Sequence, residues 1–390
     1  MENFNHRLIE NPFSNDDIKV GIKTLKSKNL TMGTKTAAFE KLFSKKLGSK
    51  YAVMVNSGSS ANLLALKCIT NHLKKKFLKK GDECLVPGLC WSTTFWPILQ
   101  SNLNPKFVDI NINNFCIDLK TIKKNITKKT KAIFIINVLG NCSDIDEIQK
   151  FCKRKKIILI EDNCESLGSI YKKKYLGTYG ELGTFSFYCS HQISSGEGGM
   201  IVTNSYENYK ILKSLRAHGW DRDIKPKNKK IFNFINEGYN VRPLEISASI
   251  GMNQFKRIDK LKKVRSQNRD LIIRSLKNSE NWRNQFKFFD NDSSLEPSWF
   301  GLPLVINEKF ANKKMKYLNY LNKNKIETRP IISGNFLNQV CMKNSKFKKF
   351  YKKLPNTEMV SKRGFFIGIP NKIINNKSLN ILSDKLLKYF

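Results

Sequence analysis

Residues 184–199, TFSFYCSHQISSGEGG, bring a serine, a histidine and a glycine-rich turn close together. Ser186 follows an apolar run and offers a hydroxyl group to an anion. His191 lies five residues further on, and imidazole can take up and release a proton near neutral pH. The glycines at 196, 198 and 199 let the backbone pass close to a flat ligand. The segment therefore predicts a ligand site that contains an acid–base group.

A second small-residue turn, NSGSSAN, connects an apolar run to a helical pattern at residues 56–62. Gly58, Ser59 and Ser60 would stand at the start of that helix. Backbone N–H groups at a helix N-terminus, together with small hydroxyls, form a site suited to one phosphate. Turns of this composition are also common without a ligand. The turn alone therefore leaves a phosphate site and a plain turn open.

Two further segments place functional groups directly after predicted strands. In IILIEDNCESLGS, residues 157–169, a fully apolar run ends in Glu161 and Asp162. A carboxylate that emerges from a buried strand needs a partner, and a protonated pyridine nitrogen is one such partner. A helix cap or a metal ligand is the alternative, although no histidine or further acid stands at ligand spacing. Trp91 follows another strand, where it could stack on a ring, but its position alone favours the core.

The elements that would hold these groups alternate along the chain. Ser14 and Asp17 predict a capped helix over residues 15–27. Short apolar runs then alternate with helical stretches up to GMIVTN at 199–204, which predicts βαβ units and a mainly parallel sheet. A long basic amphipathic helix begins near residue 255. We therefore predict a large α/β domain over 1–255 and a smaller α+β domain over 256–390.

Composition limits the class of protein. The chain has 390 residues, 40% of them hydrophobic, and a formal net charge of +38. Its basic residues are mostly lysines scattered along the sequence, so we expect no nucleic-acid partner, because such binding needs basic residues gathered on one face. No apolar run is long enough to span a membrane, and the N-terminus lacks the apolar core of a signal peptide. Nine cysteines without a CxxC pair are typical of a reduced cytoplasmic protein.

Six motifs in order resemble one family. They are NSGSSAN, PGLCW, EDNCES, TFSFYCSHQISSGEGGMIVT, LRAHGW and GYNVRPLEISASIGMNQ. This series resembles the sugar aminotransferases and dehydratases of the DegT/DnrJ/EryC1/StrS family, and the resemblance covers residues from about 10 to 385. The resemblance implies a pyridoxal-phosphate (PLP) protein of fold type I, with a mainly parallel central sheet flanked by helices and a smaller α+β C-terminal domain.

The resemblance also implies roles for residues that match the motifs. The cofactor phosphate would lie against Gly58, Ser59, Ser60 and Ser186, and Trp91 would stack on the ring. Asp162 would pair with the pyridine nitrogen, and Glu165 would lie near the ring hydroxyl. Asn240 would reach the phosphate of the neighbouring subunit, which implies a homodimer with composite sites.

His191 departs from the aminotransferase pattern. Family aminotransferases carry there the lysine that bonds covalently to the cofactor, and imidazole cannot form that bond. A subset of the family with histidine at this position removes the C3 hydroxyl of nucleotide-linked 4-keto-6-deoxysugars through the pyridoxamine form of the cofactor. One route of this kind needs an iron–sulfur cluster on four downstream cysteines, but only Cys341 follows Cys189. The resemblance thus implies the other route, with L-glutamate as amino donor, ammonia released and no metal.

Four more residues are candidates for binding the substrate. Arginine forks suit a diphosphate or a carboxylate, and the sequence offers Arg216, His218, Arg222 and Arg329, each of which could instead be a surface residue. Two alternatives to the dehydratase stay open. An ordinary sugar aminotransferase could use a lysine from Lys172–Lys174, and an inactive homologue could bind a sugar nucleotide without turning it over.

Overall fold

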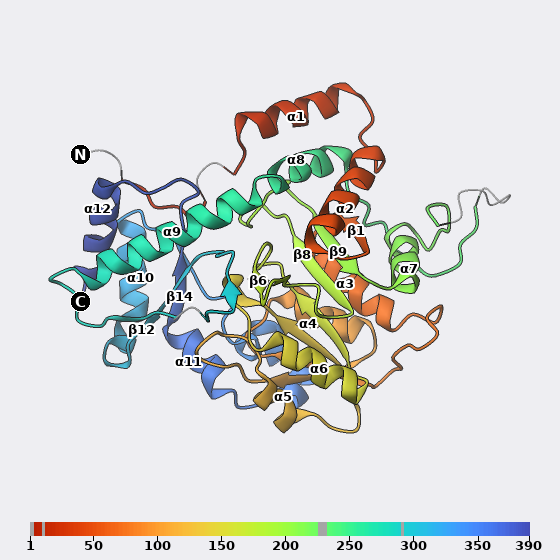
Figure 1. The fold of residues 1–390 in the computed structure, drawn as a ribbon. Coiled ribbons are helices and arrows are strands. Elements are labelled where there is room, and N and C mark those ends of the chain that lie inside the picture. The colour runs from red at the N-terminus through yellow and green to blue at the C-terminus, as the bar shows by residue number, and fades with distance from the viewer. Residues whose placement is uncertain (1–3, 10–11, 225–231, 290–291) are drawn as a thin grey trace.

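The computed structural model describes residues 4–9, 12–224, 232–289 and 292–390. A seven-stranded sheet forms its centre (Figure 1). The strand order is β1 (Tyr51–Val55), β9 (Gly199–Thr203), β8 (Leu182–Ser186), β5 (Ile158–Asp162), β4 (Thr130–Ile136), β2 (Glu83–Pro87) and β3 (Asn104–Val108). In this sheet β9 runs antiparallel to its neighbours β1 and β8, and the other neighbouring strands pair in parallel. The predicted mainly parallel sheet is therefore confirmed.

Alternating side chains divide the core between the two faces of this sheet. Val53 and Val55 pack on one face, whereas Ala52 and Met54 pack on the other, because successive residues of a strand point in opposite directions. The first face is covered by α3 (Gly58–Ile69), α4 (Ser92–Gln100) and α7 (Tyr206–Arg216). The second is covered by α2 (Thr34–Leu47), α5 (Leu119–Asn125), α6 (Ile145–Lys155) and α8 (Glu245–Phe255).

The small domain is built on a second sheet. Its strands run in the order β10 (Phe286–Lys287), β12 (Leu302–Ile306), β14 (Gly364–Ile367) and β13 (Thr328–Arg329), all antiparallel. Apolar side chains of α9 (Ile258–Lys277), α10 (Lys314–Lys323) and α12 (Asn376–Leu387) form a core with it. Helix α9 runs from the end of α8 to the side of α12 (Figure 1).

Several connections link the domains. α11 (Pro355–Arg363) contacts β14 and places Val360 in the core of the large domain. Short 3₁₀ turns lie at Val138–Gly140, Glu308–Lys313, Phe336–Asn338, Val340–Lys343 and Ser345–Phe350, and a small sheet joins β11 (Leu295–Glu296), β6 (Ile170–Tyr171) and β7 (Lys174–Tyr175). The domains are therefore packed together rather than joined by a free linker.

The N-terminal segment lies partly on the small domain. His6 pairs with Ile326 next to β13, and Phe4 packs against the small-domain core. α1 (Asn15–Lys26) then packs on α8, and its predicted capping box is present, with the Ser14 hydroxyl accepting from the Asp17 N–H. The expected division at residue 255 thus overlooks that the first described residues contact the small domain.

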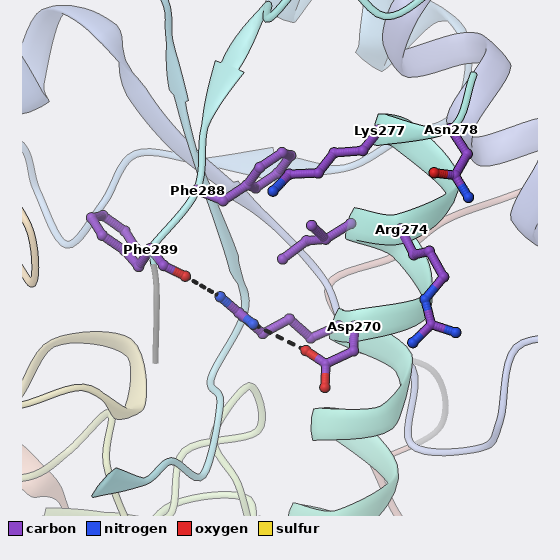
Figure 2. Close-up of a pocket in the computed structure, with 8 residues that line it drawn as sticks. Asp270, Arg274, Lys277, Asn278, Phe288 and Phe289 are labelled. Atoms are coloured by element: carbon purple, nitrogen blue, oxygen red, sulfur yellow. Dashed lines mark hydrogen bonds and ion pairs between the residues drawn. The ribbon is translucent and has the colours of Figure 1, made fainter. Parts of the chain in front are cut away.

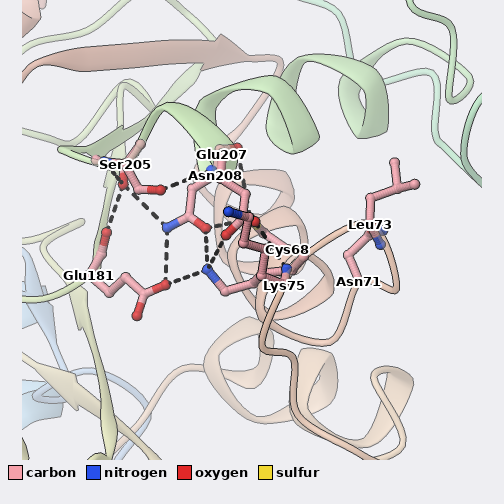
Figure 3. Close-up of polar contacts among 10 residues, drawn as sticks. Cys68, Asn71, Leu73, Lys75, Glu181, Ser205, Glu207 and Asn208 are labelled. Atoms are coloured by element: carbon pink, nitrogen blue, oxygen red, sulfur yellow. Dashed lines mark hydrogen bonds and ion pairs between the residues drawn. The ribbon is translucent and has the colours of Figure 1, made fainter.

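A buried polar cluster ties the helices of the large domain to its sheet. The Lys74 ammonium donates to Glu181 Oε1 at 2.8 Å and to Asn208 Oδ1 at 2.6 Å. Figure 3 shows Glu181, Glu207 and Asn208 converging in this cluster. Because the ammonium has carboxylate and amide partners, its burial is compensated and its role is structural. Within the described residues no helix is long and apolar enough to cross a membrane, and all nine cysteines are free thiols.

Candidate functional site

A cavity of about 690 Å³ lies where the carboxyl ends of β5 and β8 approach the small domain. It is lined from the large domain by residues that include Gly58, Trp91 and Asp162, and from the small domain by residues that include Arg329 and Phe366. Ligand sites of open α/β sheets commonly lie at this edge of the sheet.

The N-terminus of α3 forms a small-residue cradle in the cavity wall. Ser57 caps the helix, since its hydroxyl accepts from the Ser60 N–H at 3.1 Å. A Cβ atom on Gly58 would lie only 2.5 Å from Ser186 Cβ, so only glycine allows β8 to approach the helix this closely. Ser59 donates its hydroxyl to Thr93 at 3.1 Å. Backbone N–H groups and hydroxyls thus converge where a single phosphate fits.

The serines that line the cavity at this cradle differ from those that the sequence predicts. Ser60 is not among the lining residues, and its hydroxyl donates to Asn56 Oδ1 at 2.6 Å. Ser57, which the sequence analysis did not single out, does line the cavity. Its position directly before the helix was the available signal, because serine is a preferred N-cap residue.

The two adjacent acids at the end of β5 point to opposite sides. Glu161 is fully buried and accepts from the N–H groups of Tyr179 and Gly180 in the loop before β8. Asp162 points into the cavity and accepts from Asn62 Nδ2 at 2.8 Å and Thr94 Oγ1 at 2.9 Å. Both of these side-chain donors are neutral, so the charge of Asp162 is oriented but not neutralised by them. A cation such as a pyridinium nitrogen would complete the site.

Trp91 and Glu165 occupy other parts of the wall. Trp91 is 55% exposed. The core position that its place in the sequence favours by itself is therefore wrong. An exposed ring in the cavity wall can instead stack on a flat ligand. Glu165 is half-buried and accepts from the Leu139 N–H at 3.0 Å. Burial raises the pKa of Glu165 to about 7, opposed by that hydrogen bond and helped by the nearby charge of Asp162.

His191 is held by its backbone, and its ring remains available. Its N–H donates to the Tyr188 carbonyl at 3.0 Å, and its ring meets Phe300 edge-on with 5.1 Å between centroids. The Nδ1 atom is buried and has no hydrogen-bond partner among the residues that the structure describes. Burial lowers the pKa of His191 to about 4, so the imidazole is neutral at neutral pH. A neutral imidazole facing a cavity is ready to accept a proton.

The candidate substrate residues fall into two groups. Arg329 lines the cavity from β13. Arg216, in contrast, is only 2% exposed, donates to Glu40 Oε1 at 2.6 Å and does not line the cavity. The expectation that Arg216 binds substrate is corrected accordingly, because a buried ion pair already occupies its guanidinium.

His218, Arg222 and Asn240 also lie outside the lining of this cavity. All three are exposed, and His218 and Asn240 lie close together, since the His218 N–H donates to the Tyr239 carbonyl and Ala217 pairs with Asn240. The Arg222 guanidinium lies 4.2 Å from the centre of the Trp220 ring. We call the segment that carries them the 217–240 arm, restricted to its described residues 217–224 and 232–240.

The charges around the cavity are unbalanced. Four carboxylates line it, but Arg329 is the one lysine or arginine among the described lining residues. In particular, Lys172 donates to Asp146 Oδ2 in the β6–β7 hairpin, and no residue of Lys172–Lys174 lines the cavity. The structure thus brings together Gly58, Ser59, Trp91, Asp162, Glu165, Ser186, His191 and Arg329.

Two smaller hollows lie elsewhere. One, of about 330 Å³, lies on α9, where Figure 2 shows Asp270, Arg274, Lys277 and Asn278 on the helix and Phe288 and Phe289 on the neighbouring segment. The other, of about 460 Å³, has lysines from residues 120–124 and 352–353 on its rim. The first is also lined by Arg269, which is 4% exposed and donates to Asp270 Oδ1 and to the Phe289 carbonyl. No group of three or more metal-ligating side chains occurs in the described parts of the chain.

Comparisons with known proteins agree with the motifs. A model of the DegT/DnrJ/EryC1/StrS aminotransferase family matches residues 13–383. The chain belongs to this family. Among members of the family, GDP-4-keto-6-deoxy-D-mannose 3-dehydratase of Escherichia coli O55:H7 is 40% identical over 381 residues, which cover 93% of the chain and 95% of that protein. The family predicted from the motifs is confirmed.

Solved structures of family members share the fold. The E. coli GDP-4-keto-6-deoxy-D-mannose-3-dehydratase with bound hydrated PLP superposes with a TM-score of 0.89 at 38% identity, covering 98% of the chain and 99% of that structure. A GDP-4-keto-6-deoxymannose-3-dehydratase with a trapped PLP–glutamate geminal diamine gives a TM-score of 0.88 at 38% identity, covering 98% and 100%. The expected PLP fold is confirmed, with a central parallel sheet, flanking helices and a smaller second domain.

Proposed function

We propose that the chain is a PLP- and pyridoxamine-phosphate-dependent 3-dehydratase. It removes the C3 hydroxyl of a nucleotide-linked 4-keto-6-deoxyhexose, uses L-glutamate as amino donor and releases ammonia. The observation that carries this proposal is His191, which lines a cavity that otherwise fits the cofactor and whose described lining contains no lysine. A sugar aminotransferase would need such a lysine to bond to the cofactor.

The cavity fits the cofactor group by group. Ser57, Gly58, Ser59 and Ser186 would receive the phosphate at the start of α3. Trp91 would cover the ring, and Asp162 would hold the pyridine nitrogen protonated. When bound, the cofactor supplies an electron-withdrawing ring and an amine that reacts with a ketone.

His191 moves the proton in this proposal. Its neutral ring has an unpartnered Nδ1, so it can accept a proton as base and return it to the departing C3 hydroxyl as acid. Both proton transfers benefit from the exclusion of water, because stray water would compete for the proton. Phe300 and Phe366 give this side of the cavity an apolar surface.

We further propose a homodimer with composite sites. The phosphate, the diphosphate and glutamate are all anions, yet one chain offers the cavity four carboxylates and a single arginine. Three residues of the 217–240 arm, His218, Arg222 and Asn240, are exposed and do not line the cofactor cavity of their own chain. Delivery of this arm to the partner's cavity would supply the missing donors. Sedimentation of the Arg222→Ala and Asn240→Ala variants reports whether they remain dimers, and a titration in parallel reports their affinity for the cofactor. Weaker cofactor binding by an intact dimer would support an arm that completes the partner's cavity.

The nucleotide, the product class and the cellular compartment complete the proposal. The nucleotide to test first is GDP, because relatives at 40% identity act on GDP-sugars. The product class is a 3-deoxy-4-ketosugar for deoxysugar and O-antigen biosynthesis. Nine free thiols suit a reduced compartment, and we place the enzyme in the cytoplasm.

The decisive experiment compares wild type, His191→Asn and His191→Lys with matched cofactor loading. Wild type with glutamate should shift the absorbance of the cofactor from the aldehyde to the amine form, and on addition of the sugar nucleotide it should release ammonia whose nitrogen comes from glutamate. His191→Lys should lose dehydration and become covalently linked to the cofactor on borohydride reduction. Borohydride trapping of cofactor on a lysine of the wild-type protein would support the aminotransferase instead. Bound sugar nucleotide without any glutamate reaction would support an inactive binding protein.

A further inference from the structure

The N-terminal strap, residues 4–9, is fixed along the small domain beside the cavity. The His6 N–H donates to the Lys325 carbonyl at 2.8 Å, and the His6 carbonyl accepts from the Glu327 N–H at 2.9 Å. His6 Nε2 lies 2.9 Å from the Gly368 carbonyl oxygen. The strap passes so close to Gly368 that a Cβ atom there would lie 2.2 Å from the Arg7 carbonyl oxygen. These contacts bring Leu8 and Ile9 into the cavity wall.

The Glu327 carboxylate joins the strap to the cavity's arginine. Its Oε2 atom accepts from the Leu8 N–H at 3.1 Å, and its Oε1 atom accepts from the Arg329 guanidinium at 2.7 Å. The other terminal nitrogen of Arg329 donates to the Thr328 carbonyl at 3.0 Å. Because the Arg329 side chain is 53% exposed, it would sample many rotamers without these two acceptors.

We propose that Glu327 is a positioning residue that sets the direction of Arg329 and the position of the strap wall together. Arg329 then presents its remaining N–H groups to an oxyanion of the substrate, while Leu8 and Ile9 provide the apolar surface beside it. This inference rests on the proposed function, in which a carboxylate of glutamate and a diphosphate of the sugar nucleotide use the same cavity in turn. The shared chemistry is an oxyanion held by one oriented guanidinium.

Three variants of the holoenzyme separate the two contacts of Glu327. Glu327→Ala removes both acceptors, whereas Glu327→Gln keeps one neutral oxygen for the Leu8 N–H and loses the charge that faces Arg329. Glu308→Ala is the matched control, since Glu308 is an exposed glutamate of the same domain, 3.8 Å from Arg363 and outside the cavity lining.

Hydrogen exchange reports the strap without any need for activity. In Glu327→Ala the Leu8 amide should exchange about fivefold faster, the effect of losing one ordinary hydrogen bond. In Glu327→Gln and in Glu308→Ala it should exchange as in wild type. Unchanged exchange in Glu327→Ala would overturn the link between Glu327 and the strap.

Kinetics report the orientation of Arg329. Both Glu327 variants should raise the KM for glutamate, for the sugar nucleotide or for both about three- to tenfold, because one oriented ionic contact is lost. The kcat should stay nearly unchanged, because His191, which transfers the proton, is untouched. A rise confined to glutamate assigns the oxyanion to the donor carboxylate, and a rise confined to the sugar nucleotide assigns it to the diphosphate. Unchanged KM values for both substrates would overturn the proposal. If the wild-type enzyme does not react with glutamate at all, the proposed function fails, and the exchange measurement still tests the strap.

Discussion

The buried imidazole of His191 should make the protein lose stability as the pH falls. The pKa of His191 is lowered from 6.5 to about 4 by burial, so the unfolded chain binds a proton in a range where the folded chain does not. Stability is therefore fully present above about pH 6.5 and is lost progressively down to about pH 4. A tenfold difference in proton affinity is about 1.4 kcal/mol, which gives about 3 kcal/mol over the whole range.

Glu165 opposes this effect in the same cavity. Burial raises its pKa from 4.5 to about 7, so the folded chain holds a proton that the unfolded chain has already lost. The stability linked to Glu165 is present below about pH 4.5 and is lost as the pH rises to about 7. The two effects have similar size and opposite sign. The free energy of unfolding of the wild type would therefore change little between about pH 4.5 and pH 6.5. Variants are needed to separate the two effects.

The assay is urea unfolding of cofactor-free wild type, His191→Asn and Glu165→Gln. Relative to His191→Asn, wild type should lose about 2 kcal/mol between pH 7 and pH 5, which is the part of the His191 effect that falls in this interval. Relative to Glu165→Gln, wild type should gain stability over the same interval. His72→Asn is the control, because His72 is exposed and lies outside the cavity lining.

Parallel curves for wild type and His191→Asn would refute the reasoning. They would mean that the imidazole takes up protons equally well in the folded and unfolded chains, so that the folded cavity does not exclude the charged form. An imidazole with its ordinary pKa would still be mostly neutral at pH 7 and could act as a base, so this result would overturn the effect of burial and leave the proposed role of His191 to the activity assays.

Three other outcomes are expected. Arg216→Ala should lower the free energy of unfolding by about 3–5 kcal/mol in urea titrations, because Glu40 would remain as a buried charge without its main partner; a loss below about 1 kcal/mol would contradict the buried pair. Gly368→Ala should displace the strap and speed tryptic cleavage after Arg7, as followed by mass spectrometry, because the new Cβ would overlap the Arg7 carbonyl; an unchanged rate would contradict that contact. Trp91→Ala should weaken cofactor binding about tenfold by fluorescence titration, whereas Trp91→Phe should retain most of the affinity, and equal losses would exclude stacking.

The sequence could identify the groups that follow strands, because the sheet itself brings them together. Asp162 and Ser186 end neighbouring parallel strands, so the pattern of apolar runs already places them at one edge. The helix after Ser14 was predictable for a similar local reason, since its cap involves residues three apart. The sheet, the family and the His191 position all rested on such short-range or repeated signals.

What the sequence could not separate were polar residues whose partners lie far along the chain. Arg216 and Arg329 both stand in short polar stretches, yet Arg216 meets Glu40 in the core and Arg329 faces the cavity. Ser57 and Ser60 differ by less than one helical turn, and only the direction of each hydroxyl decides which one lines the cavity. The Glu327–Leu8 contact joins residues more than three hundred positions apart, and no local pattern indicates it.

The physical cost of the site argues that it binds a ligand. A buried nitrogen without a partner costs about 1–3 kcal/mol, and the Nδ1 atom of His191 is such a group. Asp162 adds a nearly buried carboxylate whose two side-chain donors are both neutral. Apolar side chains at both positions would make a more stable cavity wall, so neither group is explained by folding alone. A cationic ring held by Asp162 and a transferable proton facing His191 satisfy both groups together, which is the arrangement that the dehydratase chemistry requires.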